Sequence, residues 1–342
     1  MFFTEEIPLA FTTKPLKDES LVSFILRLTQ LNHLKNPTQL LKYFTGSTTK
    51  PPTVKHIIRI AELTCCSTSE ISQLFGFEWS TNELGLARKI NNEYITKPYF
   101  ISSRYLAYCP KCIEEENYLR SYWEFTFLKA CPTHKIYLID KCPLCHRALT
   151  WRRPGVDICT CGGILNTAET STADDFSLFI SSIIVQHVTQ NRGITIPNTL
   201  PIDITNKLLQ LNLDSLFKTL WLFGHTLSYK FKRHKKNNRP CKVINTTEIL
   251  NKAHSLLSNW PDSFFNSLEY FSEELSKTKS SPLLLQMFGP IHRYITEDMD
   301  SNEFLFIQLA YERHIRRTWK LLDKQIPSSI SRQLDLPFKD IQ

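Results

Sequence analysis

The chain has 342 residues, of which 42% are hydrophobic, so it is long enough and apolar enough for two or three domains with cores of their own. No uninterrupted apolar run approaches the roughly 18 residues of a membrane span, and the first residues lack the basic region of a signal peptide, so we expect a cytoplasmic protein without a membrane partner. Only 9 glycines occur and the common phosphate-loop motifs are missing, which argues against a nucleotide-binding architecture. The net charge of +8 fits a polyanionic partner but does not require one.

Residues 1–105 are predicted to form an N-terminal domain of short helices. An apolar stripe at helical spacing begins at Leu21, and a second helix is expected to end at Gly46. Residues 53–64 have the pattern of a third helix. Its inward side chains are predicted to be Val54, Ile57, Ile58, Ala61 and Leu63.

A capping box, Ser67 with Glu70, starts a fourth short helix directly after the third. Two helices joined by a short turn resemble a helix-turn-helix, and an ordinary helical hairpin is the alternative. No Arg or Lys lies between Ser67 and Glu78, although a helix that reads base edges usually carries such donors. This helix pair is therefore expected to contact protein.

Residues 106–165 contain eight possible zinc ligands within 53 residues. They form four close pairs, and two such pairs complete a tetrahedral shell that leaves no position for water. The pattern therefore predicts two structural zinc ions and favours this reading over a disulfide framework. The ligands are Cys109, Cys112, Cys131, His134, Cys142, Cys145, Cys159 and Cys161. A sequential arrangement, four ligands to each ion in chain order, is favoured because only seven residues separate His134 from Cys142. A cross-brace is the alternative.

This zinc module is expected to contain short strands. Residues 122–127 and 136–139 have strand composition, and residues 148–158 have the pattern of a hairpin with its turn at Pro154-Gly155. So small a module has little core, and each structural zinc can supply about 10–16 kcal/mol of folding free energy. The acidic run Glu114-Glu115-Glu116 is interpreted as solubilising.

Residues 166–342 are predicted to form a C-terminal helical domain. Helices are expected near 176–184 and 208–221, after Asp262 as an N-cap, and over 302–324. The predicted fold class is thus mainly α with a small zinc-stabilised module that contains β-structure.

A strongly basic segment over 230–242 is the candidate for contact with the phosphate backbone of DNA or RNA, and a solvated linker is the alternative. Its cations are Lys230, Lys232, Arg233, Lys235, Lys236, Arg239 and Lys242. The final helix adds four cations on one face, which fit either a second contact or an exposed polar surface. They are Arg313, Arg316, Arg317 and Lys320.

No catalytic residue is predicted. The chain shows no pairing of a nucleophile with a base, and zinc shells that are filled by protein cannot activate water. We therefore expect neither an enzyme nor a small-molecule substrate.

The order of these features resembles the TniQ/TnsD family of transposon target-selection proteins. One match is the box Pro15-x-x-Asp18-Glu19-Ser20-Leu21 with Ser23 and Arg27. Another is Tyr108-Cys109-Pro110-x-Cys112, Trp123, Cys131-Pro132-x-His134-x-x-x-Leu138 and Cys142-Pro143-x-Cys145. A weaker match is Trp260-Pro261-x-x-Phe264.

The resemblance implies a bacterial, non-enzymatic adaptor that marks an insertion site and recruits an AAA+ regulator of the TnsC type. Some members read target DNA directly, as TnsD does. Others are TniQ proteins that dock, often as a dimer, on an RNA-guided Cascade complex of CRISPR effector proteins and guide RNA. The length of the chain and its second complete zinc site tilt the expectation toward the Cascade-associated type, with the direct DNA reader as the alternative.

Overall fold

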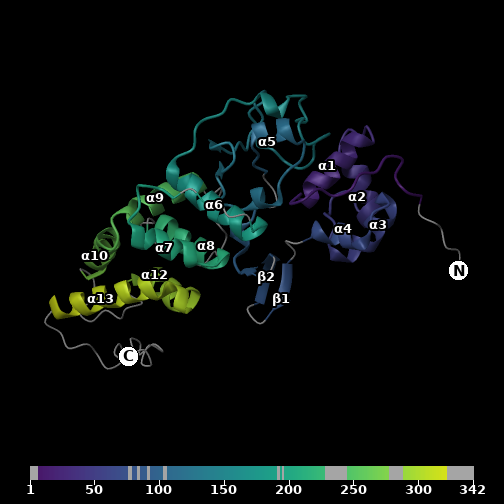
Figure 1. Cartoon of the computed structure of the whole chain (residues 1–342). Coiled ribbons are helices and arrows are strands. Elements are labelled where there is room, and N and C mark those ends of the chain that lie inside the picture. The colour runs from purple at the N-terminus through teal and green to yellow at the C-terminus, as the bar shows by residue number, and fades with distance from the viewer. Residues whose placement is uncertain are drawn as a thin grey trace. The chain divides into compact units, whose positions relative to one another are not determined.

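The structure is a computed structural model that describes residues 7–75, 79–82, 85–90, 93–102, 106–190, 193–194, 196–227, 245–276 and 288–321. Contacts divide the chain into two compact units, Met1–Ile196 and Pro197–Gln342 (Figure 1). The expected fold class is confirmed, since the described residues are mostly helical with few strands. The division into domains at 105 and 165 stays a prediction.

The first unit begins with the N-terminal helical bundle, which consists of α1 (Leu21–Leu31), α2 (Thr38–Thr45), η1 (Val54–His56), α3 (Ile57–Thr64) and α4 (Thr68–Gln73). Its boundaries follow local chemistry. The Ser20 hydroxyl accepts the Ser23 N–H at the start of α1, and Gly46 ends α2 with a φ of 73°. Ser67 and Glu70 form the expected capping box. The predicted helices are confirmed.

Two side chains of the third predicted helix face the other way from the prediction. Val54 and Ile58 are 51% and 64% exposed, whereas Ile60 is fully buried beside Leu63. Val54 lies in the 3-10 turn η1, which does not continue the face of α3. Ile58 lies in α3 two residues from Ile60, on the opposite side of the helix. The core of the bundle is built by Phe24, Ile25, Leu28, Leu40, Leu41, Phe44, Ile60, Leu63 and Ile71.

A three-stranded antiparallel sheet follows the bundle, where the sequence predicted only helices. Its strands are β1 (Trp79–Asn82), β2 (Gly85–Ile90) and β3 (Glu93–Ile95), in the order β1-β2-β3. Arg88 of β2 lies opposite Trp79 on one side and Ile95 on the other. The all-helical expectation for residues 1–105 is therefore wrong here.

The middle of the chain is dominated by turns. Its short elements are η2 (Pro98–Phe100), α5 (Pro110–Glu115), η3 (Ser121–Glu124), β4 (Ala130–Cys131), β5 (Ile136–Tyr137) and η4 (Leu165–Thr167). The strand predicted over 122–127 is wrong, because residues 121–124 form a 3-10 turn that buries Trp123. The strand predicted over 136–139 is confirmed in its first half, where β5 pairs with β4.

The hairpin predicted over 148–158 is also wrong. The Arg153 side chain is 1% exposed and occupies the inside of this segment, where its guanidinium donates to the carbonyl oxygens of Gly155 and Val156 at 3.0 Å each. The two ends of the segment pair elsewhere: Ala148 bridges to Lys141, and Ile158 bridges to Ile164.

Helix α6 (Asp175–Thr189) closes the first unit. Asp174 caps it by accepting the Ser177 N–H at 2.9 Å. All nine side chains from Phe176 to Ile184 are buried, the apolar ones and the three serines alike. The Ser181 hydroxyl accepts the Ala130 N–H of β4 at 3.1 Å, so α6 packs directly on the middle segment.

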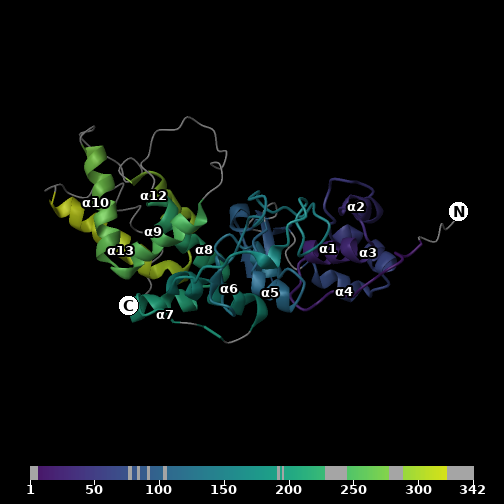
Figure 2. The same ribbon diagram turned by 90° about the horizontal axis from the view of Figure 1, so that it is seen from above.

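The regular elements among the described residues of the second unit are all helices. They are α7 (Ile202–Gln210), α8 (Leu213–Trp221), η5 (Leu222–Thr226), α9 (Thr246–Ser258), α10 (Asp262–Ser276), α12 (Pro290–Arg293), η6 (Tyr294–Asp298), η7 (Asn302–Phe304) and α13 (Leu305–Leu321). Helix α10 packs against α9 and α13 (Figure 2). In the core of this unit, the ring centroids of Phe223, Trp260 and Phe264 lie 5.2–5.7 Å apart.

Two predicted helices of the second unit have slightly different boundaries in the structure. Helix α10 begins at Asp262 itself, so this residue lies in the first turn and is not an N-cap. The final predicted helix is present as η7 followed by α13. Within the described parts of both units, no helix has the length and apolar character needed to span a bilayer.

Candidate metal centres

The eight predicted ligands fall into two clusters of four. The first cluster is Cys109, Cys112, Cys131 and His134, and the second cluster is Cys142, Cys145, Cys159 and Cys161. Within each cluster all four ligand atoms lie within 4.8 Å of one another. The grouping is the sequential one that the spacing favoured.

Two elements bring the first cluster together. Cys109 is the N-cap of α5, and Cys112 lies in the first turn of that helix. Cys131 ends β4, and His134 lies in the turn that leads into β5. The Nδ1 atom of His134 is 3.4, 3.3 and 3.6 Å from the sulfurs of Cys109, Cys112 and Cys131, and the sulfurs of Cys112 and Cys131 are 3.6 Å apart.

These separations fit a tetrahedral ion. Zinc with Zn–S bonds of about 2.3 Å and a Zn–N bond of about 2.0 Å places its ligand atoms about 3.5–3.8 Å from one another. Cys109 and Cys131 are almost fully buried, and Cys112 is 8% exposed. Three sulfurs and one imidazole nitrogen thus face a common point that protein shields from solvent.

Electrostatics explain why such a cluster favours a cation. Hydrogen bonds from Cys109 and Cys112 lower the pKa of Cys131. The hydrogen bonds of Cys112 with Cys109 and Cys131 raise the pKa of Cys112. Ionisation of Cys112 would place a second negative charge beside that of Cys131. A divalent ion between the sulfurs removes that repulsion and allows all three thiols to ionise.

The second cluster is built from two tight turns and is more open. The sulfurs of Cys142 and Cys161 are 3.6 Å apart, and those of Cys145 and Cys159 are 3.9 Å apart. Cys142 and Cys159 are buried, whereas Cys161 is exposed. A hydrogen bond from the backbone N–H of Arg147, followed by one from its side chain, lowers the pKa of Cys145 to about 6. This thiol is therefore prepared to ligate as a thiolate.

One ligand turn recurs in both clusters. The carbonyl of Cys131 accepts the Lys135 N–H at 2.8 Å, and the carbonyl of Cys142 accepts the His146 N–H at 3.0 Å. Lys135 and His146 both have left-handed backbones, with φ of 56° and 55°. The chain therefore reverses within five residues, which turns both ligands of each pair toward the same point.

Gly163 is a residue of the second cluster that the sequence analysis missed. A Cβ atom at this position would lie 2.9 Å from the Cys142 sulfur and 2.9 Å from the Leu144 Cβ. The Gly163 carbonyl also accepts the Cys159 N–H at 2.9 Å. The signal was available, because the two glycines that follow the last ligand pair indicate a close backbone approach.

Glu115 is the second missed residue, because its exposed carboxylate also contacts a side chain of the first cluster. Its carboxylate oxygen lies 3.0 Å from the Nε2 atom of His134. Glu116 instead pairs with Arg120, and Glu114 is exposed. The three neighbouring carboxylates therefore differ in role. Glu115 is the last residue of α5 and lies three residues beyond Cys112, whereas the backbone of Glu116 is already extended.

The sequence around the first cluster is similar to a known protein family. Residues 10–138 match the family model TniQ. This part of the chain belongs to the TniQ family. TniQ proteins form a transposon-associated family of target-selection proteins. A search of curated proteins gives no match to the chain.

The TniQ match includes the N-terminal bundle and all four ligands of the first cluster, and it ends before the second cluster. It also contains the box that carried the resemblance. In the structure this box is a buried ion pair: Arg27 donates to the Glu19 carboxylate at 2.8 Å, and the Glu19 side chain is fully buried. The Ser23 hydroxyl donates to the other oxygen of Glu19 at 2.7 Å.

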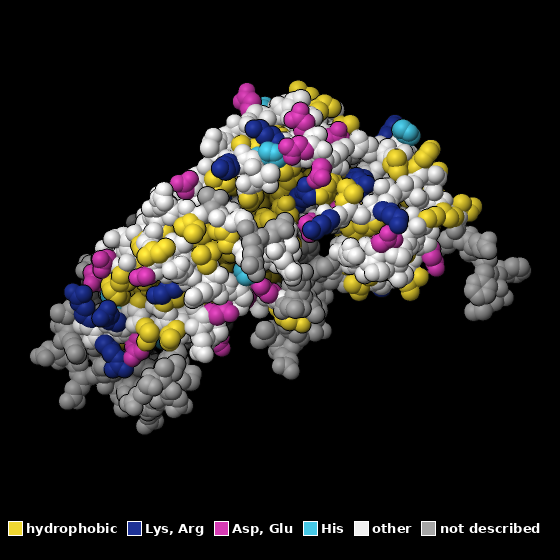
Figure 3. All heavy atoms as spheres, viewed as in Figure 1, with side chains coloured by type: hydrophobic (Ala, Val, Ile, Leu, Met, Phe, Trp, Pro, Cys, Tyr) yellow, Lys and Arg dark blue, Asp and Glu magenta, His cyan; other side chains and the backbone are white. Residues whose placement is uncertain are grey.

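The predicted phosphate contacts of this TniQ-containing chain are only partly described. Residues 230–242 lie outside the described residues, and with them all seven candidate cations of that segment. On α13, Arg313, Arg316 and Arg317 are exposed, and Arg316 pairs with Glu312 at 2.6 Å. Lys and Arg side chains gather near the end of α13 (Figure 3). The side chain of Lys320 is not described.

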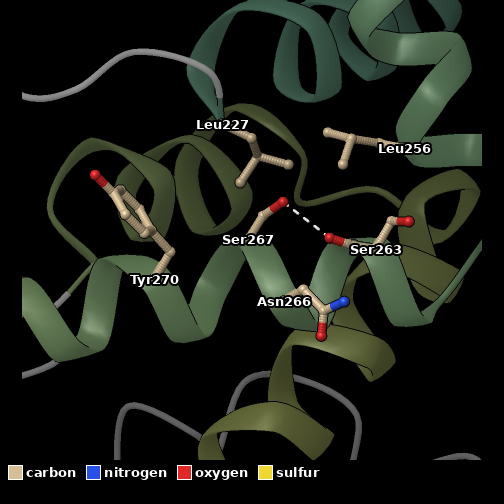
Figure 4. A pocket seen from close by; sticks show the side chains of 6 residues that line it. All are labelled: Leu227, Leu256, Ser263, Asn266, Ser267 and Tyr270. Carbon is tan, nitrogen blue, oxygen red and sulfur yellow. Dashed lines mark hydrogen bonds between the residues drawn. The ribbon is translucent and has the colours of Figure 1, made fainter.

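A shallow pocket lies in the second unit, between α9 and α10 (Figure 4). Its lining residues are Leu227, Leu256, Ser263, Asn266, Ser267 and Tyr270. The Ser267 hydroxyl donates to the backbone carbonyl of Ser263 at 2.8 Å. These six residues include no Cys, His, Asp or Glu, so the pocket offers no metal ligand of the kind found in the two clusters.

Proposed function

We propose that this chain is a non-catalytic adaptor for transposon target selection, stabilised by two zinc ions. The observation that carries the proposal is the TniQ match over residues 10–138, which includes a complete cluster of metal ligands. A closed shell of protein ligands gives an ion no open position for a reacting water. The metal therefore serves the fold, and the adaptor leaves bond breaking to other proteins.

Zinc is the ion that best suits both clusters. Three thiols with one imidazole, or four thiols, in a tetrahedral arrangement are the ligand sets of structural zinc. Such ions contribute their binding free energy to folding, which suits a middle segment composed largely of turns. Metal analysis of the purified chain should find two zinc ions per molecule, and one ion or none would contradict the proposal.

As partners we propose an RNA-guided Cascade complex on one side and an AAA+ regulator of the TnsC type on the other. The seven cations of the 230–242 segment would contact a phosphate backbone of target DNA or guide RNA. Phosphate contacts position a complex without reading sequence. In such an assembly the guide RNA specifies the target sequence. We propose that the adaptor binds the Cascade complex as a homodimer.

The alternative function is that of a TnsD-like protein, which reads its attachment site on DNA directly. The exposed polar residues of α4 include Ser69, Ser72 and Gln73, and the helix has no Arg or Lys for base edges. This sparse set of donors supports the adaptor. Selection from a random DNA duplex pool distinguishes the two, because enrichment of one sequence by the isolated chain would favour the direct reader.

The second arm of the experiment identifies partners. A tagged chain should co-purify Cascade subunits with guide RNA, together with an AAA+ regulator, from the cells that encode it. Binding of the isolated chain to duplex DNA should be weak, similar for all sequences, and steeply reduced by salt. Selective, tight binding without any Cascade subunit would contradict the proposed assembly.

A further inference from the structure

Helix α1 contacts both metal clusters through the loops that the ligands close. The first metal loop, residues 113–130, connects Cys112 with Cys131. The second metal loop, residues 146–158, connects Cys145 with Cys159. Each loop is therefore closed at both ends by ligands of one cluster.

The start of α1 is held by the first metal loop. The Ser20 N–H donates to the Leu119 carbonyl at 3.0 Å, and the Ser121 N–H donates to the Asp18 carbonyl at 2.7 Å. The Leu119 N–H donates in turn to the Ser23 hydroxyl at 2.8 Å. Leu119 is 2% exposed and Ser23 is fully buried, so water cannot replace these hydrogen bonds without opening the contact.

The end of α1 is held by the second metal loop. The Gln30 side chain donates to the Asp157 carboxylate at 3.2 Å. A Cβ atom on Gly155 would lie 2.8 Å from the Gln30 side-chain oxygen, so the loop backbone packs directly against this side chain. Trp151 of the same loop packs on the core of the N-terminal bundle. The buried Arg153 side chain fixes the shape of the loop between them.

These contacts lie at opposite ends of the helix. Ser20 and Gln30 are separated by about 15 Å along α1, given a rise of 1.5 Å per residue. One contact leaves a helix free to swing about it, whereas two contacts that far apart fix its direction. Because α1 contributes Phe24 and Leu28 to the core of the bundle, its direction sets that of the other helices.

We propose that the two metal ions act as separate clamps on α1, the first ion at its start and the second at its end. Together they fix the orientation of the N-terminal bundle on the metal-bearing segment. Ser23 and Gln30 are the positioning residues through which the clamps act. This inference rests on the proposed binding of two metal ions, and it assigns each ion a different end of the helix.

Hydrogen–deuterium exchange of the full chain tests the clamps. Cys131→Ser should lose one zinc and speed exchange at the amides of Ser20, Leu119 and Ser121 by tenfold or more, with less change at residues 28–34. Cys161→Ser should lose the other zinc and reverse that pattern. Amides of α8 in the second unit serve as the internal reference. Variants that each lose one zinc yet leave α1 unchanged, or loosen both its ends equally, would overturn the proposal.

A second pair of variants keeps every metal ligand, in case a cysteine variant fails to fold. Ser23→Ala should speed exchange at the start of α1, and Gln30→Ala should do so at its end, while both variants retain two zinc ions. Ser69→Ala on α4 and Gln39→Ala on α2 are matched controls, because both side chains are exposed. Equal exchange in test and control variants would refute the clamps. A wild-type chain with fewer than two zinc ions would instead contradict the proposed metal binding.

Discussion

The imidazole of His134 lies between a carboxylate and three sulfurs. Its Nε2 atom is 3.0 Å from Glu115, while its Nδ1 atom faces Cys109, Cys112 and Cys131. A hydrogen bond from Nε2 to the carboxylate fixes the tautomer that leaves the Nδ1 lone pair free for a metal. Glu115 therefore orients a ligand although it does not belong to the cluster.

Replacing Glu115 by Gln should weaken zinc binding at the first cluster by about 10–100-fold, the usual cost of removing such a partner. Competition with a chromophoric chelator measures the change. Glu114→Gln on the same helix is the control and should leave affinity unchanged, since Glu114 is exposed and lies beside the ligand face. Equal affinities for the two variants would show that the carboxylate has no role in ligation.

Gly163→Ala should damage the second cluster alone. The added methyl would lie 2.9 Å from the Cys142 sulfur, and relief of that clash requires a ligand or the turn to shift. Crowding of this kind costs about 1–3 kcal/mol. We expect the zinc content to fall from two toward one during dialysis against a mild chelator. Gly193→Ala, with no atom within 4 Å of its new Cβ, should keep both ions.

Arg27→Met should destabilise the first unit by about 3–5 kcal/mol, because it leaves the Glu19 carboxylate buried without a cation. Burial already raises the pKa of Glu19, so the carboxylate is poorly solvated even in the intact pair. Urea unfolding measures the loss. Arg316→Ala removes an exposed pair with Glu312 and should cost at most about 0.5 kcal/mol. Similar losses from both variants would argue against a role for burial.

Acid should destabilise the second unit. Burial lowers the pKa of His225 to about 4, and it also lowers the pKa values of His292 and His314. The unfolded chain therefore binds more protons than the folded chain between pH 6.5 and 4, so the free energy of unfolding falls as the pH decreases through this range. After allowance for its partial exposure, His225 alone contributes roughly 1–2 kcal/mol.

Exchange rates of α8 and α9 amides, corrected for intrinsic pH dependence, measure this loss at pH 7 and pH 5. His225→Gln should reduce the difference between the two pH values, because glutamine does not titrate. The His225 ring stacks on Trp221 at 4.0 Å, so the variant also loses a packing contact and is less stable at both pH values. An unchanged pH dependence in this variant would assign the effect to the other histidines.

The two clusters were predictable because their chemistry is local. Two soft ligands separated by one or two residues can face the same point on a tight turn. The short sequence distances made the sequential grouping the simpler one. Helix ends such as Ser20 and Gly46 were predictable for the same reason, since a cap depends on one side chain or one φ angle.

Other features depend on contacts that no short window contains. The aromatic residues around Trp123 alternate as in a strand, yet the backbone there forms a 3-10 turn between the two ends of the first metal loop. Arg153 was expected to lie in a hairpin. Its guanidinium instead donates to the carbonyl oxygens of Gly155 and Val156 inside the second metal loop. Glu115 acquires its role only once His134, far along the chain, is placed opposite it.

The two clusters differ in how far solvent reaches their sulfurs. Cys109, Cys112 and Cys131 are buried, whereas the thiol of Cys161 lies at the surface. Oxidants attack accessible thiolates first, and a sulfenic acid or disulfide is a poor zinc ligand. Oxidative damage should therefore begin at the second cluster, and the ion proposed for the first cluster would be the last to be released.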